Sequence, residues 1–437
     1  MFELIVNGQK VLSAENRKLL DFLREDLHLT SVKNGCGEGA CGTCMVLIDG
    51  KAVKACVQQI KNLSGKSIIT VEGLNLREKA VYSYAFAAAG AVQCGFCIPG
   101  MVISAKGLID KEPNPTKEQV KEAIKNNICR CTGYKKIEEA IMLAAKMFRE
   151  CTEIPSEHYR GILGENMQRT DAAAKVLGSA EYSADIYLEG MLVGSALRSE
   201  YPRAVVKSID VSAAKKLPGV AAVITAAELP GKQKVGHLKK DFDVLIPVGS
   251  CTHYLGDAIA LVAAETYEIL EEAKKLIKVE YEVLTPLTSP AESLADGAPL
   301  IHEDGNVMSR ISLVRGNAEE AIAASKYVVT NHYSLPFTEH AYLEPETAVA
   351  LPEGDTVRVY CGDQGVYQTQ GEIAEATGLP RDKVHVTAKM VGGGFGGKED
   401  QTVQHHAALL ALAAQRPVKV SLTRQESLVV STKRHPM

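Results

Sequence analysis

The chain opens on two short runs, FELIV and QKVLS, in which apolar and polar side chains alternate. They flank Asn7-Gly8, a dipeptide typical of two-residue hairpin turns. Residues 16–27 then place apolar side chains at helical spacing, and residues 45–60 hold two further strand-like runs. A strand pair, a helix, a loop and more strands indicate a small α+β domain, which we expect to occupy residues 1–76.

The pattern then becomes helical, because apolar residues recur every three or four positions in four consecutive segments. One of these segments begins after Thr116, and Gln119 follows three residues later. A Thr and a Gln at this spacing form a capping box at the start of a helix. We therefore predict a compact, all-helical domain over residues 77–151.

Residues 152–175 show no sustained period, and we interpret them as a surface linker. Beyond them, strand-like and helical segments alternate, as in GDAIALVAAE followed by TYEILEEAKKL. The alternation predicts mixed helix and strand structure in two regions, residues 176–290 and 300–437. The predicted fold class is therefore multidomain α+β.

Composition and charge are those of an ordinary soluble protein. Of the 437 residues 46% are hydrophobic, and the formal net charge is −4, which gives no indication of nucleic-acid binding. The N-terminus lacks the basic and apolar regions of a signal peptide. No apolar run reaches the roughly 18 residues that a membrane span needs. We expect a cytoplasmic protein that binds neither nucleic acid nor a membrane.

Eight of the eleven cysteines are crowded into a stretch of fewer than a hundred residues, which indicates metal or redox chemistry in a cytosolic chain. The first group is Cys36, Cys41, Cys44 and Cys56. Its C-x₄-C-x₂-C spacing with a distant fourth cysteine is typical of a plant-type [2Fe–2S] cluster. Zinc is the alternative, but zinc is usually held by paired C-x₂-C motifs.

The second group is Cys94, Cys97, Cys129 and Cys131, in the stretches CGFC and CRC. By itself it leaves zinc binding and thiol exchange open, because a C-x₂-C pair serves both. Beside the first group, a second [2Fe–2S] cluster is the stronger interpretation, since two adjacent one-electron centres make a path for electrons.

The two groups in tandem resemble the iron–sulfur part of the molybdenum hydroxylases, the xanthine dehydrogenase and aldehyde oxidoreductase family. All eight cysteines match, seven of them within SVKNGCGEGACGTC, QCGFCIPGM and NICRCTGY and the eighth at Cys56. The resemblance implies a ferredoxin-like β-grasp domain over residues 1–76 and a helical [2Fe–2S] domain over 77–151. It further implies an α/β hammerhead-type domain at 176–290 and a partial molybdenum-cofactor-binding α+β domain at 300–437. It also implies that Gln93 touches the pterin.

A third motif, KMVGGGFGGKED at residues 389–400, places five glycines around Phe395. The glycines satisfy the bare G-x-G-x-x-G spacing, but the motif lies late in the chain and not in an N-terminal βαβ unit. A P-loop would need Ser or Thr at the position of Glu399. A tight strand-to-helix connection without any ligand is the third interpretation.

The family resemblance accounts for the whole motif, because molybdenum hydroxylases carry a similar GGGFGGKE stretch. It implies that the backbone around Gly396 lies close to the metal and the pterin, and that Phe395 stacks on a flat substrate ring. Glu399 matches an acidic residue with which purine-oxidising members bind their substrate. Gln364, 31 residues before Phe395, matches a glutamine that contacts an oxo ligand of molybdenum.

The resemblance implies two [2Fe–2S] clusters, a molybdenum–pterin cofactor and a small-molecule substrate. The expected reaction is the oxidation of a purine such as xanthine, or of a related N-heterocycle or aldehyde, with oxygen from water. Electrons would then leave singly through the two clusters. An alternative function is an iron–sulfur electron-transfer module whose C-terminal half only docks a partner, and a zinc-stabilised scaffold is a third.

Two family features are not found in this sequence. The linker of residues 152–175 is too short for a flavin-binding domain, so any flavin would sit on a separate subunit. The general base has no match here, and we expect it beyond residue 437. The sequence is then either a C-terminally truncated enzyme or one part of a site that a second chain completes. In both cases we expect the isolated chain to be inactive.

Overall fold

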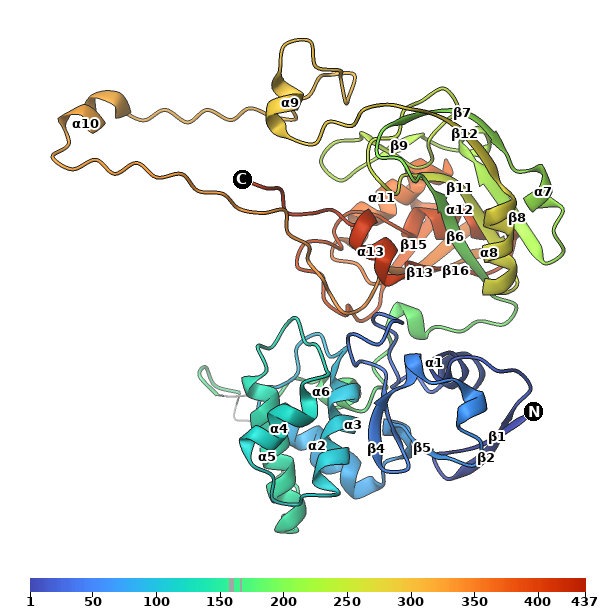
Figure 1. The fold of residues 1–437 in the computed structure, drawn as a ribbon, viewed down its shortest axis with the longest axis vertical. Helices are drawn as coiled ribbons and strands as arrows, with labels where there is room; N and C mark the ends of the chain where they lie inside the picture. The colour runs from blue at the N-terminus through green and yellow to red at the C-terminus, as the bar shows by residue number, and fades with distance from the viewer. Residues whose placement is uncertain (157–160, 166) are drawn as a thin grey trace.

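The computed structural model describes residues 1–156, 161–165 and 167–437. Figure 1 shows two regions, an N-terminal part coloured blue to cyan and an α/β part coloured green to red. The predicted linker connects them, and its residues 157–160 and 166 lie outside the described residues.

The first domain is built on a five-stranded sheet with the order β2-β1-β5-β3-β4. Its strands are β1 (Phe2–Val6), β2 (Gln9–Ser13), β3 (Met45–Ile48), β4 (Lys51–Lys54) and β5 (Ser67–Ile69). The predicted hairpin of β1 and β2 is confirmed, and Asn7 and Gly8 have the positive φ angles, 50° and 81°, that its turn requires. The short helix α1 (Leu19–Asp21) buries Leu19 and Leu20 in the core of this domain.

The second domain is helical, as the sequence predicted. Its helices are α2 (Leu76–Ala88), α3 (Ile98–Ile109), α4 (Lys117–Ile124) and α5 (Lys135–Arg149). The predicted capping box is present, because the hydroxyl of Thr116 accepts from the Gln119 N–H at 3.2 Å and the Gln119 side chain accepts from the Thr116 N–H at 2.7 Å. The two cysteine-bearing stretches lie before α3 and between α4 and α5.

A single seven-stranded sheet, in the order β15-β14-β13-β16-β6-β11-β8, runs through the α/β part. Its strands are β6 (Leu192–Arg198), β8 (Val220–Thr225), β11 (Ala258–Ala264), β13 (Thr347–Glu353), β14 (Thr356–Cys361), β15 (Val384–Ala388) and β16 (Val418–Ser421). Parallel pairing of β16 with β6 joins strands from both predicted regions, 176–290 and 300–437. The two regions therefore share one sheet.

Helices cover both faces of this sheet. All seven residues of β11 are buried. Leu261 and Ala263 share a core with α12 (Gln404–Ala414), while Ala260 and Val262 share another with α8 (Tyr267–Leu276). Alternate residues of a strand point to opposite faces, so a strand covered on both sides is apolar throughout. Helix α11 (Val366–Thr377) packs beside α12 and β15.

None of the helices in the described ranges is long and apolar enough to cross a membrane.

Smaller elements complete the α/β part. They are β7 (Ala204–Asp210), α7 (Ser212–Lys215), β9 (Lys234–Val235), β10 (Phe242–Asp243), β12 (Lys278–Val283) and α13 (Arg424–Val430). Helix α6 (Ala172–Val176), at the end of the predicted linker, instead packs against α2 and α3 and buries Ala172 and Val176 in the core of the helical domain. β7 pairs with β12 in a two-stranded ribbon, and β9 pairs with β10.

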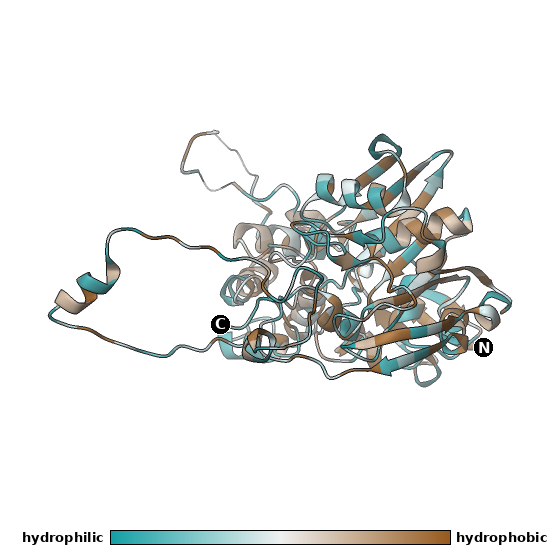
Figure 2. Cartoon of the chain, turned by 90° about the horizontal axis from the view of Figure 1, so that it is seen from above, coloured by the Kyte–Doolittle hydropathy of each residue, from teal (hydrophilic) through white to brown (hydrophobic). Residues whose placement is uncertain are grey.

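Between β12 and β13 the chain leaves the body of the molecule. This stretch holds two short helices, α9 (Pro290–Leu294) and α10 (Ala318–Ala324), and every residue from 307 to 338 is exposed. We call residues 307–338 the arm. Figure 1 shows the arm reaching away from the other elements, and Figure 2 shows hydrophobic and hydrophilic residues mixed along it.

Candidate redox and cofactor site

The first cysteine group lies in a glycine-rich loop that directs backbone N–H groups at sulfur. The N–H groups of Glu38 and Cys41 both lie 3.4 Å from the sulfur of Cys36, and the Gly39 N–H lies 3.2 Å from the sulfur of Cys56. Gly39 has φ of 82°, a conformation that favours glycine. Such N–H groups stabilise negative charge on sulfur, which is what cysteine ligands of an iron–sulfur cluster carry.

The four thiols of this group are in contact. Hydrogen bonds from the thiols of Cys41 and Cys56 hold the pKa of Cys36 far below its usual range. The thiol of Cys56 also hydrogen-bonds Cys44 and lowers its pKa. The described side chains include no set of three or more His, Cys, Asp or Glu arranged around one metal ion. Four converging thiols with N–H donors around them fit a [2Fe–2S] cluster.

The second group is assembled from two connections of the helical domain. Cys97 is the N-cap of α3, and its hydrogen bond to Cys129, followed by burial, raises the pKa of the Cys97 thiol well above its usual value. Hydrogen bonds from Cys131 and then Cys97 lower the pKa of Cys129, and the hydroxyl of Thr132 adds a further one at 3.2 Å. Cys131 also bonds the sulfur of Cys94 and lowers its pKa. All four predicted cysteines therefore come together here as well.

The two cysteine loops touch each other directly. The Ile128 N–H donates to the carbonyl of Cys41 at 2.7 Å, and the Asn127 side chain donates to the carbonyl of Gly42 at 2.9 Å. Gly42 allows this approach, because a Cβ at that position would lie 2.1 Å from the carbonyl oxygen of Asn126. Cys41 belongs to the first group and Ile128 precedes Cys129 of the second, so the contact joins the two groups.

The second cysteine group in turn adjoins the glycine-rich loop of residues 392–397. Phe96, between Cys94 and Cys97, lies so close that a Cβ on Gly392 would be 3.0 Å from its ring. Arg130, between Cys129 and Cys131, donates to the carbonyl of His340 at 3.0 Å. A Cβ on Gly397 would be 2.8 Å from the His340 ring. The three motifs that sequence reasoning singled out are therefore consecutive neighbours in space.

Most glycines of the loop are required by packing against protein side chains. A Cβ on Gly392 would lie 2.3 Å from that of Glu344, and a Cβ on Gly394 would lie 2.2 Å from Oε1 of Gln364. At Gly396 nothing lies within 4 Å, and its φ is 88°. The backbone is thus open at Gly396, the position that the family resemblance assigned to the cofactor.

A buried ion pair and a glutamine side chain hold the glycine-rich loop in place. Nζ of Lys398 lies 2.8 Å from Oε2 of Glu344, and the two side chains are only 2% and 1% exposed. Glu344 Oε2 also accepts from the Gly392 N–H at 2.7 Å. Gln364 Oε1 accepts from the N–H groups of Gly396 and Lys398, each at 3.2 Å.

The orientation of the Gln364 amide follows from these contacts. Both of its partners are N–H donors, so the oxygen faces the loop and the NH₂ group faces outward. No acceptor among the described residues binds that NH₂ group. Its two hydrogens are available to an oxygen ligand on the side of Gln364 that faces away from the loop.

The remaining predicted residues are exposed. Phe395 is half exposed and has φ of 56°, an uncommon conformation for a residue other than glycine. Glu399 lines a cavity of about 550 Å³ together with Glu372 and His237, and Phe395 is not among its lining residues. Gln93 is exposed, and its carbonyl accepts from Nζ of Lys175 at 3.0 Å. The structure therefore brings Gly396 and Gln364 together and places Glu399 in a separate hollow.

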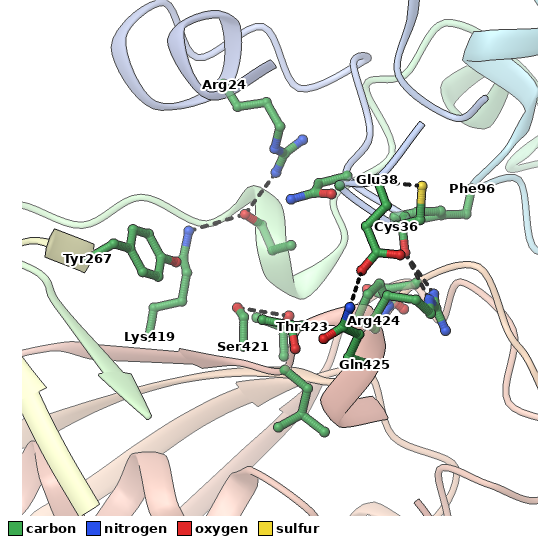
Figure 3. Close-up of a pocket in the computed structure, with 18 of the residues that line it drawn as sticks. Arg24, Cys36, Glu38, Phe96, Tyr267, Lys419, Ser421, Thr423, Arg424 and Gln425 are labelled. Carbon is green, nitrogen blue, oxygen red and sulfur yellow. Dashed lines mark hydrogen bonds between the residues drawn. The ribbon is translucent and has the colours of Figure 1, made fainter. Parts of the chain in front are cut away.

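A cavity of about 350 Å³ separates the first cysteine loop from β16 and α13, as Figure 3 shows. Arg424 crosses the boundary and donates to the carbonyl of Gly35 at 3.0 and 2.9 Å and to that of Leu343 at 2.8 Å. Gln425 donates to Glu38 at 3.0 Å. These contacts hold the loop that contains Cys36 against the C-terminal strands.

Sequence reasoning missed four residues that organise this site. Glu344 lies in HAYLEPETAVA, a stretch that resembles the approach to the cofactor region in the family, but nothing in it shows the pairing with Lys398. Arg424 belongs to no motif, and nothing in the sequence shows that it reaches the first cysteine loop. Phe96 lies inside CGFC and Arg130 inside CRC. Their positions between cluster cysteines are the signal from which they could have been predicted to contact the neighbouring loop.

Comparison with known proteins agrees with this arrangement. Family models match a 2Fe-2S iron-sulfur cluster binding domain at residues 4–67 and a [2Fe-2S] binding domain at 70–142. They also match the aldehyde oxidase and xanthine dehydrogenase a/b hammerhead domain at 177–285 and a molybdopterin cofactor-binding domain at 301–437. A solved structure of aldehyde oxidoreductase from Desulfovibrio gigas superimposes with a TM-score of 0.93 at 32% identity. The matched region includes 100% of this chain and 51% of the aldehyde oxidoreductase chain. The chain belongs to the molybdenum hydroxylase family.

This chain spans different shares of its curated relatives. The aldehyde oxidoreductase of Megalodesulfovibrio gigas is 34% identical over 99% of this chain and 50% of its own length. A probable xanthine dehydrogenase subunit of Bacillus subtilis is 42% identical over 62% of this chain and 36% of its own length. The nicotinate dehydrogenase small FeS subunit of Eubacterium barkeri is 45% identical over 33% of this chain and 93% of its own length. The chain thus spans half or less of the first two relatives.

Proposed function

We propose that this chain is the iron–sulfur part, and one wall of the molybdenum site, of a hydroxylase that oxidises a purine such as xanthine. The observation that carries the proposal is the series of direct contacts from the first cysteine loop to the second and on to the glycine-rich loop. Two electrons released at one site must leave singly, and neighbouring one-electron centres provide that route. The molybdenum–pterin cofactor, when bound, supplies the two-electron oxidation chemistry.

The cluster ligands follow from the convergence of the thiols. We assign Cys36, Cys41, Cys44 and Cys56 to one [2Fe–2S] cluster and Cys94, Cys97, Cys129 and Cys131 to the other. The contact between Cys41 and Ile128 supports electron transfer between them. We keep the domain bounds predicted from sequence, at residues 1–76, 77–151, 176–290 and 300–437.

We assign cofactor binding to Gln93, Gln364, Phe395 and Gly396. The outward NH₂ group of Gln364 is suited to donate to an oxygen ligand, and the open backbone at Gly396 lets the cofactor approach closely. Phe395 offers an exposed ring to the flat face of the substrate. Glu399 accepts hydrogen bonds when ionised and so selects a heterocycle by its N–H groups. Glu399 lines a cavity that Phe395 does not line, so our preference for a purine over other N-heterocycles and aldehydes rests on the family resemblance at this carboxyl and not on its position.

The partners follow from the regions that this chain does not provide. Between the second cluster domain and the hammerhead domain, the matched family models leave residues 143–176, too few for a flavin-binding domain. We therefore place any FAD on a separate subunit. We also place the general base outside these 437 residues, in polypeptide that completes the molybdenum site. Cysteine ligands for iron need reducing conditions, which favours the cytoplasm.

Metal analysis and EPR on the purified chain test the proposal. We expect about four iron atoms per chain, no zinc, and two distinct [2Fe–2S] signals after reduction. Molybdenum should be far below one atom per chain, and xanthine should not reduce an electron-accepting dye. Zinc in place of iron, or substrate-dependent dye reduction by this chain alone, would contradict the proposal.

A second candidate is an electron-transfer module whose C-terminal half only docks a partner. The match to a separate small FeS subunit, over 93% of that subunit's length, favours it. Adding the completing polypeptide distinguishes the two functions. Molybdenum uptake and xanthine oxidation by the complex support the hydroxylase, whereas electron transfer without molybdenum uptake supports the module.

A further inference from the structure

Three basic side chains are buried together where the first cysteine loop meets the α/β part. Arg24 is 4% exposed, Lys419 is 5% exposed and Lys33 is not exposed at all. Lys33 lies three residues before Cys36, and Lys419 belongs to β16. A buried cation is costly unless an anion compensates it. The negative charges around these three residues therefore decide what they can do.

One carboxylate among the described residues pairs with these cations. Oδ1 of Asp185 accepts from Nη2 of Arg24 at 3.0 Å, and Oδ2 accepts from Nζ of Lys33 at 2.5 Å. Within the described chain Lys419 forms no ion pair, and its Nζ donates to the carbonyl of Ala184 at 3.1 Å. Burial lowers the pKa of Lys419 to about 8, so it is still protonated at pH 7.

We call Arg24, Lys33, Lys419 and Asp185 the charge group. Three positive charges and one negative charge give it a net charge of +2. The side chain of Asp185 is only 4% exposed, so water does not screen the excess charge well.

The charge group adjoins the first cysteine loop. The hydroxyl of Thr43 donates to the carbonyl of Lys33 at 3.0 Å and lies 3.2 Å from the sulfur of Cys41. Cys36 lines the cavity between this loop and β16, and so do Arg24 and Lys419 (Figure 3). The net positive charge therefore lies on the side of the loop that holds Cys36 and Cys41.

The acidic side chains that line this cavity do not cancel the charge. Glu25 and Glu38 are exposed, so water and salt screen them. Glu344 is paired with Lys398 at 2.8 Å. The anion that remains to compensate the charge group is the first cluster when it is bound, because four thiolates make it negative and reduction adds one more negative charge.

Tyr182 holds the charge group between the two cysteine groups. Its N–H donates to Oδ2 of Asp185 at 3.0 Å, and its ring centre lies 4.6 Å from Nζ of Lys33. Its hydroxyl donates to the carbonyl of Cys94 at 2.6 Å, and its ring meets that of Phe96 edge-on at 5.2 Å. The contact with the second group thus reaches a carbonyl and not a sulfur, so we expect the charge to act more strongly on the first group.

We propose that the charge group raises the reduction potential of the first [2Fe–2S] cluster. A net positive charge in a poorly screened interior stabilises the reduced cluster more than the oxidised one. This favours the transfer of one electron from the second cluster, which is oxidised, to the first, which is reduced, and no other reactant takes part. The four residues act through their charges and touch no reacting atom. The inference rests on the proposed function, because it requires both clusters.

Redox titration of the purified chain at pH 7, followed by EPR, tests the inference. Lys33→Met removes one cation and should lower the ratio of reduced to oxidised first cluster at least tenfold at a fixed potential. A tenfold change corresponds to 59 mV for a one-electron couple. Asp185→Asn removes the carboxylate and should raise the same ratio at least tenfold. Both variants should change the second cluster less than the first.

Two further variants keep the test independent of folding defects. The double variant Lys33→Met/Asp185→Asn removes one charge of each sign, so it keeps the net charge and should stay within threefold of the parent. It also avoids the unpaired lysine that Asp185→Asn leaves buried. Lys419→Met breaks no described ion pair and should lower the ratio at least threefold.

Lys175 provides a control at another position. It is 5% exposed, like Lys419, but it pairs with Asp171 at 2.8 Å and binds the carbonyl of Gln93 beside the second cysteine group. Lys175→Met should therefore change the ratio for the first cluster less than threefold.

Other results would overturn the inference. Shifts of the same sign in Lys33→Met and Asp185→Asn would show that these residues act by distorting the loop. Shifts below threefold in Lys33→Met and Lys419→Met would show that the charge is screened. Iron content and EPR of the parent chain keep the two proposals apart. Intact clusters with unshifted ratios refute only the role of the charge group, whereas absence of iron refutes the proposed function.

Discussion

At the scale of single residues, the glycine-rich loop depends on charged and polar groups beneath it. Glu344 and Lys398 form a buried pair, and Glu344 also holds the Gly392 N–H. Removing one partner of a buried pair leaves the other charge without compensation, which costs more than the pair itself contributes. The stability of the loop should therefore be most sensitive to single substitutions in this pair.

We predict that Lys398→Met lowers the free energy of unfolding by about 3–5 kcal/mol, because the Glu344 carboxylate stays buried without its partner. The double variant Glu344→Gln/Lys398→Met removes both charges and should recover part of that loss. Denaturant unfolding measures both. A loss below about 1 kcal/mol in the single variant would show that water reaches Glu344.

Glu372 gives a pH-dependent prediction. Its side chain is 6% exposed, and burial, followed by the charge of Asp400, raises its pKa to about 7. The folded protein therefore binds this proton more tightly than the unfolded chain. The associated stability is complete below the unfolded pKa of about 4.5 and is lost as the pH rises to about 7.

Glu372→Gln mimics the protonated form and should be more stable than the parent at pH 8. One pKa unit corresponds to about 1.4 kcal/mol, so the rise from about 4.5 to about 7 predicts a gain on the order of 3 kcal/mol. At pH 4 the two proteins should unfold alike. Thermal unfolding of both proteins at pH 8 and pH 4 measures this. A stability difference that is the same at both pH values would contradict the raised pKa of Glu372.

At the scale of elements, two loops of different domains meet at Gly42. Both Gly42 and Gly37 have positive φ angles, 70° and 67°. A Cβ on Gly42 would strike the Asn126 carbonyl oxygen at 2.1 Å, whereas a Cβ on Gly37 would meet only the Asn34 side chain at 3.6 Å. The two glycines share the conformational requirement, but only Gly42 is also required by packing.

Gly42→Ala should consequently cost more stability than Gly37→Ala. The left-handed conformation costs each variant roughly 1–2 kcal/mol, and the clash adds to this only at Gly42. We also expect Gly42→Ala to weaken the magnetic interaction between the two reduced clusters, measured by EPR, because it separates the loops. Equal spectra and equal losses in both variants would show that the loops are not held at this point.

At the scale of the whole molecule, arginines connect the iron–sulfur part to the seven-stranded sheet. Arg424 binds the carbonyls of Gly35 and Leu343. Arg416 makes the same kind of two-nitrogen contact with the Gly190 carbonyl, at 3.0 and 2.9 Å, but inside the α/β part. The two residues form a matched pair of which only Arg424 crosses the boundary.

We predict that Arg424→Met separates the unfolding of the two parts. Hydrogen bonds from a charged group are worth about 1.5–3 kcal/mol each, and their loss at the boundary weakens coupling between the parts. Calorimetry should show two transitions for this variant and one for Arg416→Met. One common transition in both variants would mean that other contacts dominate the boundary.

The sequence by itself determined the features that depend on neighbouring residues. The hairpin at Asn7-Gly8, the cap at Thr116 and the spacing of the eight cysteines are local patterns, because turn geometry, helix capping and ligand spacing are set within a few residues. Their recurrence in known proteins carried the family assignment as well.

Only the tertiary structure decided how these motifs meet. The pairing of β16 with β6, the Glu344–Lys398 pair and the reach of Arg424 to Gly35 join residues far apart in the chain. Such contacts depend on how whole elements pack, and their side chains leave no pattern in the local sequence. The excess of buried positive charge around Asp185 is likewise visible only in three dimensions, because Arg24, Lys33 and Lys419 come from separate segments of the chain.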